Sequence, residues 1–405
     1  MSLEWNEVKL KDVGKIVTGK TPKTSIEDNY GGHIPFLTPS DDMNVKIIQY
    51  TNKTLSLKGL NEVKNCLIPK NSVCVSCIGS DLGKVVLTSE DTVTNQQINS
   101  IIVNEDYDYN FIYYTMSLIG KQLNYMSKSS TAVPIINKST FSKELIHVPP
   151  LEEQRKISSI LSNIDNLIDN LNKINKNLEE QIETIYNSFF VYYDDYSQEE
   201  LEECEIGLIP KEWKLLSLGE VTTQIKEKVG DKDYKVFSAV NTGNLILSEE
   251  YFDKQVFSKS IEKYIVVKQK EFAYNPARIN IGSIGRNDFD YDGCVSPVYV
   301  AFKVEEEYEN FMNMFIQSDR FKQWVITLAS GSVRQTLNYA DFSIIKLAYP
   351  PIDLIKKFNN IYDNYYEVIN YNKSVIHNLE KIRDILLPKL MSGEIDVSKI
   401  NYDLE

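Results

Sequence analysis

Two long segments of the chain place apolar residues at steps of three and four, the spacing of a helix that buries one side. The first segment runs from Leu151 to about Phe190, with periodic positions at Ile157, Ile160, Ile164, Leu167, Leu171, Ile174, Leu178, Ile182, Ile185 and Phe189. The second repeats the pattern 201 residues later, at Phe358, Ile361, Tyr365, Val368, Asn372, Val375, Leu379 and Leu386, with Ile382 standing 200 residues after Ile182. Each segment predicts a long helix with coiled-coil spacing.

The shared register of these segments favours an antiparallel coiled coil between them. The alternative is that each helix packs separately on its own domain, because an apolar stripe by itself indicates only burial. We expect the seam to contain Ile157, Ile164, Leu171 and Leu178 from the first helix and Phe358, Tyr365, Asn372 and Leu379 from the second. Asn372 occupies the position of Leu171, and a polar residue on a seam can fix the register.

The segments before each helix have the alternating pattern of short strands, broken by turns of Gly, Asn, Asp and Pro. The clearest of these runs are residues 71–79, 84–90, 263–269 and 294–304. Phe111–Met126 and Phe311–Leu328 are expected to be single helices within these modules. The pattern predicts an α/β (α+β) fold in which two mixed, β-rich globular domains alternate with two long helices.

The framework of the chain occurs twice, which predicts an internal pseudo-twofold repeat. Trp5 and Leu10 recur 208 residues later as Trp213 and Leu218. The segment with Asn137, Phe141, Pro149 and Pro150 recurs after 201 residues, at Asn338, Phe342, Pro350 and Pro351. The predicted segments are a recognition domain at 1–148, a helix at 149–192, an acidic linker at 193–208, a second recognition domain at 209–349, a helix at 350–395 and a tail at 396–405.

Composition narrows the class of protein. The chain has 405 residues with 42% hydrophobic and 25% charged residues, as expected for a folded protein of more than one domain. No apolar run reaches the length of about 20 residues needed to cross a membrane, and MSLEWNEVKL does not resemble a signal peptide, so we expect a cytoplasmic location. Of the net charge of −13, residues 149–204 contribute −9, with 4 Lys+Arg against 13 Asp+Glu. Each globular module is therefore near neutral, which argues against a broad basic surface but allows local phosphate contacts.

Motifs of catalysis are absent from the sequence. It has no phosphate-binding GxxxxGK[ST] loop, no GxGxxG, no HExxH and no GxSxG. The three histidines are far apart, and Cys74 and Cys77 lie in a strand-like run without a second cysteine pair. We expect no catalytic residue, no metal site and no cofactor bound by this chain.

Two groups of loops are dense in side chains that can bind base edges or phosphates. Asn and Arg can each form paired hydrogen bonds with adenine or guanine. In the first module the candidates are Ser80, Lys84, Asn95, Gln96 and Gln97. In the second they are Asn275, Arg278, Asn280, Ser283 and Arg286, followed by Ser332, Arg334 and Gln335. The alternative is ordinary turn chemistry, because Gly, Asn and Ser are common in turns.

These features together resemble the DNA-specificity subunits of type I restriction-modification systems. The resemblance rests on the order of module and Pro-Pro helix, and on family-like motifs across nearly the whole chain. The motifs are the two Trp-x4-Leu starts, Ile34–Ser40, Pro150–Ile157, Tyr274–Gly285 and the ending Leu386–Ile395. One departure is that the second helix lacks a counterpart of Glu153-Gln154, which puts any partner contact of those residues in doubt for the second copy.

The resemblance implies that each module reads one half of a split site in double-stranded DNA. It also implies that the coiled coil sets the distance between the half-sites and carries two adenine-methyltransferase subunits, which a motor-nuclease subunit can join. S-adenosylmethionine, ATP and Mg²⁺ would then belong to the partners. Rival hypotheses are a self-contained DNA-modifying enzyme and a coiled-coil scaffold that reads no bases. The acidic first helix and linker are expected to meet basic partner surfaces.

Overall fold

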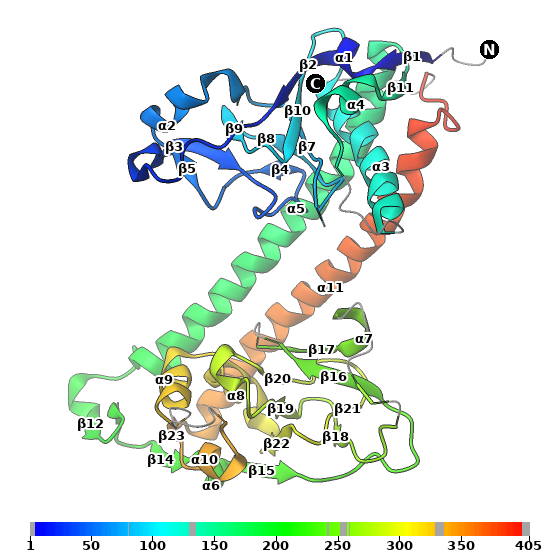
Figure 1. The fold of residues 1–405 in the computed structure, drawn as a ribbon. Coiled ribbons are helices and arrows are strands. Elements are labelled where there is room, and N and C mark those ends of the chain that lie inside the picture. Colours follow the sequence, from blue (N-terminus) through cyan, green and yellow to red (C-terminus); the bar gives the residue numbers. More distant parts are fainter. Residues whose placement is uncertain are drawn as a thin grey trace. The chain divides into compact units, whose positions relative to one another are not determined.

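The computed structural model describes residues 5–79, 81–128, 135–240, 243–251, 257–258, 260–328 and 336–398. The chain forms two compact units (Figure 1). Unit 1 comprises residues 1–172 and 373–405, and unit 2 comprises residues 173–372. Each unit contains one globular module and a part of each long helix, whereas the sequence assigned each long helix to a segment of its own. The six predicted segments stay a prediction.

The module of unit 1 is built on a five-stranded sheet with the order β2-β10-β7-β8-β4. Its strands are β2 (Gly14–Thr18), β10 (Ile98–Val103), β7 (Val73–Ser76), β8 (Val85–Thr88) and β4 (Ile47–Ile48). A second sheet has the order β5-β3-β9-β6. Its strands are β5 (Thr54–Leu55), β3 (Tyr30–Leu37), β9 (Thr92–Thr94) and β6 (Leu67–Ile68). Strands β7 and β8 were expected from alternating runs, but every residue in them is buried, so both of their faces are covered.

The helices of this module are α1 (Leu10–Val13), α2 (Leu57–Glu62), α3 (Tyr109–Lys128) and α4 (Lys138–Lys143). They pack on both of its sheets, α3 on β7 and β8 and α2 on β3 and β5 (Figure 1). Phe111 and Ile112 of α3 are fully buried against Val73 and Val75 of β7, and Trp5 packs at the edge of the same core. The single helix expected at Phe111–Met126 is therefore confirmed.

The module of unit 2 has a sheet with the order β15-β22-β19-β20. Its strands are β15 (Thr222–Ile225), β22 (Val300–Val304), β19 (Phe272–Tyr274) and β20 (Ile284–Arg286). A second sheet has the order β17-β16-β21-β18. It is formed by β17 (Leu245–Leu247), β16 (Lys235–Ala239), β21 (Gly293–Val295) and β18 (Ile265–Val267). The run 294–304 was expected as one strand, but a turn with Tyr299 N donating to Ser296 O divides it into β21 and β22.

The helices of this module are α6 (Leu218–Val221), α7 (Ser248–Tyr251), α8 (Glu309–Phe315), α9 (Asp319–Leu328) and α10 (Tyr339–Ser343). The single helix expected at Phe311–Leu328 is wrong, because the chain starts a new helix at Asp319. Ser318 Oγ accepts a hydrogen bond from Phe321 N at 3.2 Å, which satisfies an amide at the start of α9.

Both modules close with a two-stranded sheet between their first and last strands. In unit 1, β1 (Asn6–Lys9) pairs with β11 (Leu145–Val148). In unit 2, β14 (Lys214–Ser217) pairs with β23 (Lys346–Tyr349). These strands carry the repeated framework, and both pairs are antiparallel and four residues long.

The acidic linker forms more structure than expected. Tyr193, which ends the first long helix, has the left-handed backbone conformation. Beyond it, the strands β12 (Leu201–Cys204) and β13 (Gly207–Pro210) pair as a hairpin. Leu201 and Cys204 pack against the core of unit 2. The acidic linker is therefore a folded part of unit 2. Leu201 and Cys204 stand at the two ends of β12 with Glu202 and Glu203 between them, so no alternating pattern marks this strand in the sequence.

The long helices are α5 (Leu151–Asn187) and α11 (Ile352–Met391). In unit 1, the start of α5 and the end of α11 share a core that includes Ile157, Leu161 and Leu387. In unit 2, the end of α5 and the start of α11 share a core that includes Ile182, Tyr186 and Phe358.

At some positions of each long helix, the buried residue is the one that follows the apolar residue expected in the stripe. Leu167 and Ile174 are 46% and 47% exposed, whereas the neighbouring Ile168 is 9% exposed and Asn175 6%. On α11, Val368 is 46% exposed while Ile369 is fully buried. Adjacent apolar residues lie about 100° apart on a helix, so periodicity alone did not decide which of them faces the core. All eight residues expected in the seam are buried or half-buried.

Candidate nucleic-acid interface

Each module presents a hairpin at the same place in its sheet. In unit 1 the hairpin β7–β8 is joined by residues 77–84, and in unit 2 the hairpin β19–β20 is joined by residues 275–283. In each sheet the hairpin's first strand pairs with the strand that precedes the module's main helix, β10 or β22. The loops chosen from composition are therefore topologically equivalent, although their sequences differ.

The loop of unit 1 is fixed by glycine geometry. Gly83 has φ +88°, and a Cβ on it would lie 2.1 Å from the carbonyl oxygen of Gly120 in α3. Gly83 N donates to Ser76 O at 2.8 Å, and Asn124 Nδ2 donates to Leu82 O at 2.9 Å. Only glycine fits both the conformation and the close approach. The loop is thus held in one shape against α3.

Lys84 and the Asn-Gln-Gln run lie on or beside this loop. Lys84 Nζ is 2.7 Å from Asp81 Oδ1, with both side chains 35% exposed. The backbone amide of Cys77 donates to Gln97 O at 2.8 Å, so the run at 95–97 packs next to the hairpin. Gln96 is exposed, and its Oε1 accepts from Thr21 Oγ1 at 2.7 Å. Ser80 lies outside the described residues.

The side chain of Asn95 is buried and holds the conformation of residues 95–97 by bonding to Gln97. It is 7% exposed, its Oδ1 accepts from Gln97 N at 3.0 Å, and its Nδ2 donates to Gln97 Oε1 at 2.9 Å. These bonds occupy its amide within the turn and leave Gln97 half-buried. We therefore assign Asn95 to holding the loop rather than to base contact.

The loop of unit 2 exposes Arg278 and Asn280. Asn275 is half-buried, and its Oδ1 accepts from Ala277 N at 3.0 Å, which closes an Asx turn. Gly282 has φ +85°, which a residue with a Cβ rarely adopts. Ser283 is 2% exposed and donates to Ala239 O at 2.6 Å, so its hydroxyl is used inside the module.

A second segment approaches each hairpin loop. Ile136 N donates to Cys77 O at 3.0 Å in unit 1, and Leu337 N donates to Pro276 O at 3.0 Å in unit 2. The next residue in each case, Asn137 or Asn338, caps a short helix, α4 or α10. Ser332, Arg334 and Gln335 lie outside the described residues.

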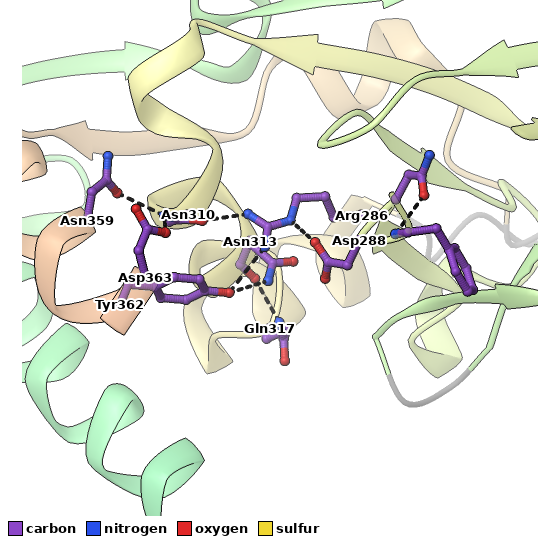
Figure 2. Close-up of polar contacts among 10 residues, drawn as sticks. Arg286, Asp288, Asn310, Asn313, Gln317, Asn359, Tyr362 and Asp363 are labelled. Atoms are coloured by element: carbon purple, nitrogen blue, oxygen red, sulfur yellow. Dashed lines mark hydrogen bonds and ion pairs between the residues drawn. The ribbon is translucent and has the colours of Figure 1, made fainter. Parts of the chain in front are cut away.

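Arg286 ends strand β20 and lies inside unit 2, where it joins the module to α11 (Figure 2). Its side chain is 5% exposed. Its Nε donates to Asp288 Oδ1 at 2.5 Å, its Nη1 to Asn310 Oδ1 at 2.7 Å and its Nη2 to the hydroxyl of Tyr362 at 3.3 Å. Since a base edge cannot reach a guanidinium engaged in this way, we leave Arg286, and likewise Ser283, out of the proposed DNA contacts. Composition could not separate this arginine from Arg278.

The bonds around Arg286 continue onto α11 (Figure 2). Asn310 of α8 donates from Nδ2 to Asp363 Oδ1 at 3.0 Å and to Asn359 Oδ1 at 3.2 Å. Asn313, also on α8, donates to the Tyr362 hydroxyl at 3.2 Å. The hairpin strand, α8 and α11 are thereby tied together by directional bonds.

Unit 1 joins its module to the long helices with a different set. Lys46 Nζ donates to the hydroxyl of Tyr114 on α3 at 3.0 Å and to Ser162 Oγ on α5 at 2.7 Å. Tyr114 donates to Asp165 Oδ2 at 2.5 Å, and Asp165 also accepts from Arg383 Nη1 of α11 at 3.0 Å. Burial lowers the pKa of Lys46, although Asp165 opposes the shift, and burial together with Asp165 raises the pKa of Tyr114.

Each hairpin loop also borders a cleft, against α3 in unit 1 and against α9 in unit 2. In unit 1 the cleft measures about 420 Å³ and is lined by Lys84, Gly120 and Tyr114 among others. In unit 2 it measures about 350 Å³ and is lined by Gly282, Phe321 and Val325 among others. Among the described residues, no three His, Cys, Asp or Glu side chains gather to hold a metal ion. No described helix is long and apolar enough to span a membrane.

Comparison with known proteins identifies the module at the start of the chain. Residues 2–180 match a family model described as the type I restriction modification DNA specificity domain. The chain is 25% identical to the type I restriction enzyme MjaIX specificity subunit of Methanocaldococcus jannaschii, over 98% of this chain and 95% of that protein. It is 38% identical to the HindI specificity subunit of Haemophilus influenzae over 173 residues, which cover 41% of this chain and 38% of that protein.

The fold has a counterpart among solved structures. The type I restriction-modification S subunit of M. genitalium superposes with a TM-score of 0.55 at 15% identity, covering 96% of both chains. This likeness is one of fold and extends over both units. The matches in sequence support a type I restriction-modification specificity subunit.

Proposed function

We propose that this chain reads a bipartite DNA sequence, one half with each module, for a type I modification complex. The observation that carries the proposal is the pair of equivalent hairpin loops, each held rigidly at the same position of its sheet and each different in sequence. Rigid presentation limits the entropy lost when side chains meet base edges. Different loops on one framework predict different half-sites.

The proposed base and phosphate contacts are the exposed or half-buried candidates. Lys84, as a point charge, suits a phosphate oxygen. Gln96, Gln97, Asn275, Arg278 and Asn280 suit base edges, because their amide and guanidinium groups can bond in pairs. Ser80, Ser332, Arg334 and Gln335 remain in the proposal on the sequence alone.

We further propose that α5 and α11 form an antiparallel coiled coil that relates the modules by a pseudo-twofold repeat. Two contacts support this arrangement. Arg383 pairs with Asp165 in unit 1, and Asn372 bonds Asn175 in unit 2. Between these contacts the chain advances ten residues along α5 and recedes eleven along α11, as antiparallel helices require.

The proposed partners are double-stranded DNA and two methyltransferase subunits, which a motor-nuclease subunit can join. In this arrangement the chain itself is not an enzyme. S-adenosylmethionine, ATP and Mg²⁺ act on the partner subunits, where a target adenine is turned out of the helix for methylation. Such a complex works in the cytoplasm. The name of each curated relative, a specificity subunit of a restriction enzyme, supports this division of labour.

The proposal is tested by mapping methylated adenines with the complete methyltransferase and then replacing Arg278 with Ala. We expect a bipartite site and, in the variant, relaxed readout of one base in only one half-site. A bidentate contact to a base is worth about 1–3 kcal/mol. Lys84→Ala is the matched comparison and should weaken binding evenly across sequences and reduce its salt dependence. Methylation without a bipartite sequence would refute the proposal.

The spacing role is tested by inserting one heptad into the middle of both α5 and α11. Seven residues add about 10 Å to a helix, which corresponds to about three base pairs of DNA. We expect the preferred spacer to lengthen by that amount. An equally long insertion at the turn of the β12–β13 hairpin should leave the spacer unchanged. If both insertions leave it unchanged, the helices do not measure the spacer.

A further inference from the structure

A buried pair of amides interrupts the apolar seam of the long helices in unit 2. Asn372 Nδ2 donates to Asn175 Oδ1 at 2.8 Å, and the two side chains are 7% and 6% exposed. Apolar residues flank them on both helices, including the fully buried Ile369. The sequence had marked Asn372 as a polar seam residue, but the structure supplies its partner.

The two asparagines occupy different positions of the heptad. Asn175 belongs to the buried series Leu161, Ile168, Asn175 and Ile182. Asn372 belongs to the other series, with Phe358, Tyr365 and Leu379, which corresponds to Leu171 in the first helix. Antiparallel helices bring one series of the first helix against the other series of the second, whereas parallel helices pair like with like. The amides therefore meet only in the antiparallel orientation.

The amides also meet in only one register. A slip of one heptad would place Asn372 against Ile168 or Ile182, and Asn175 against Leu379 or Tyr365. Each slipped arrangement buries two amides without partners, which is costly. Leucine and isoleucine contacts carry no such penalty, because apolar burial is not directional. Among the seam residues, this pair thus favours the observed register over the registers that are shifted by one heptad.

We propose that the Asn175–Asn372 pair fixes the register of α5 against α11 and thereby narrows the range of spacers that the chain accepts. The inference rests on the proposed function, because it gives the helices the role of setting the spacer. Asn175 and Asn372 act as positioning residues for DNA recognition. Their role costs stability, since a well-packed apolar pair in the same place would bury more apolar surface.

The test replaces both residues in the double variant Asn175→Leu/Asn372→Leu, expressed with its methyltransferase subunit. The substrate is a DNA library in which the two half-sites are separated by spacers that differ in one-base-pair steps. We expect the melting temperature to rise by a few degrees while methylation at non-cognate spacers increases at least tenfold relative to the cognate spacer. Each single variant leaves one amide unpaired and should melt at a lower temperature than the wild type.

The matched control is Asn170→Leu/Asn370→Leu, which adds the same side chains at exposed positions of the same helices. It should retain the narrow spacer preference. A double seam variant with an unchanged spacer profile would overturn the register role and assign the register to the packing of the modules. If the double seam variant melts at a lower temperature and keeps its spacer profile, the two asparagines stabilise the helices without setting the spacer. The heptad insertion separates these outcomes from failure of the proposed function, because it shifts the spacer whether or not the amides set the register.

Discussion

In unit 1, β1 and β11 pair Asn6 with Val148, and in unit 2, β14 and β23 pair Lys214 with Tyr349. The partners in the second pair follow those in the first by 208 and 201 residues, so both modules close with the same register. The joints to the long helices differ. Lys46, Tyr114 and Asp165 form the joint in unit 1, whereas Arg286 and Asn310 are central in unit 2. The framework repeats, and the contacts that fit each module to its helices are particular to that module.

The same contrast appears around the two repeated tryptophans. Trp213 packs against Phe190 and Tyr193 and donates from Nε1 to the Tyr196 hydroxyl at 3.0 Å. Trp5 packs instead under Gly393, where an added Cβ would lie 3.3 Å from Nε1. Gly393 and Tyr193 are both left-handed residues just after a long helix. The end of α11 is thus followed by a glycine that packs on Trp5, whereas the end of α5 is followed by a tyrosine that packs on Trp213.

The largest expected difference between the units concerns this aromatic packing. Phe190 is 4% exposed, with ring centroids 5.0 Å from Phe311 and 5.1 Å from Phe358. Phe190→Ala should lower the free energy of unfolding of unit 2 by about 3–5 kcal/mol. Met391→Ala, the matched change in unit 1, should cost about 2 kcal/mol, because Met391 is at the edge of its core. Hydrogen exchange measured separately for each unit checks both values, and a larger loss in the methionine variant would contradict the comparison.

The joints should respond unequally to loss of their cations. Arg286→Met removes the arginine donor of Asn310 and Asp288 and one of the two donors to the Tyr362 hydroxyl, and it should destabilise unit 2 by about 2–3 kcal/mol. Lys46→Met should cost less, about 1 kcal/mol, because burial already disfavours the charged form of Lys46 and lowers its pKa. Thermal unfolding is the measurement, with exposed Arg278→Met as the control, expected within about 0.5 kcal/mol of the wild type. Equal losses of stability in Arg286→Met and Lys46→Met would contradict the expected difference between the two units.

A smaller difference is expected at the first short helix of each module. Ser217 and Glu220 form a capping box at the start of α6, whereas Lys9 precedes α1 and makes no capping bond with its side chain. Ser217→Ala should cost about 1 kcal/mol. The double change Lys9→Ser/Asp12→Glu installs the same residues in unit 1 and should stabilise it by a similar amount, as measured by urea unfolding. No gain in unit 1 would mean that the surroundings of α1 prevent the box from closing.

The last prediction concerns a buried cysteine thiol that each unit contains. Ionisation of these thiols should not affect stability at neutral pH. Burial raises the pKa of Cys74 in unit 1 and of Cys294 in unit 2 to about 12. A raised thiol pKa means that the folded state retains the proton, so its contribution to stability is present below about pH 9 and is lost as the pH rises through 12. Cys74→Ala and Cys294→Ala should each flatten the decline of stability in that range. A variant whose decline matches that of the wild type would show that its thiol is not protected.

Much of the framework was predictable because it depends on local pattern. Heptad spacing defined α5 and α11, alternating runs located β7 and β8, and the Asn–Pro-Pro segment located the end of each module. Turn residues also identified the hairpin loops as candidates, since Gly83 and Gly282 must adopt positive φ. The break before α9 was missed because Ser318, which caps the new helix, does not interrupt the apolar periodicity.

The sequence by itself determined the two long helices, α3 and the strands β7 and β8, since these elements follow from spacing and turn chemistry along the chain. The tertiary structure decided that Arg286 is a buried joint and Arg278 an exposed group, although both lie in one run of polar residues. It also decided that Ile168, not Leu167, is the more buried of two adjacent apolar residues, and that Asn372 has Asn175 as its partner. The physical reason is that burial and hydrogen-bond partners depend on residues distant in sequence. Local periodicity specifies a surface of the helix without specifying what will cover it.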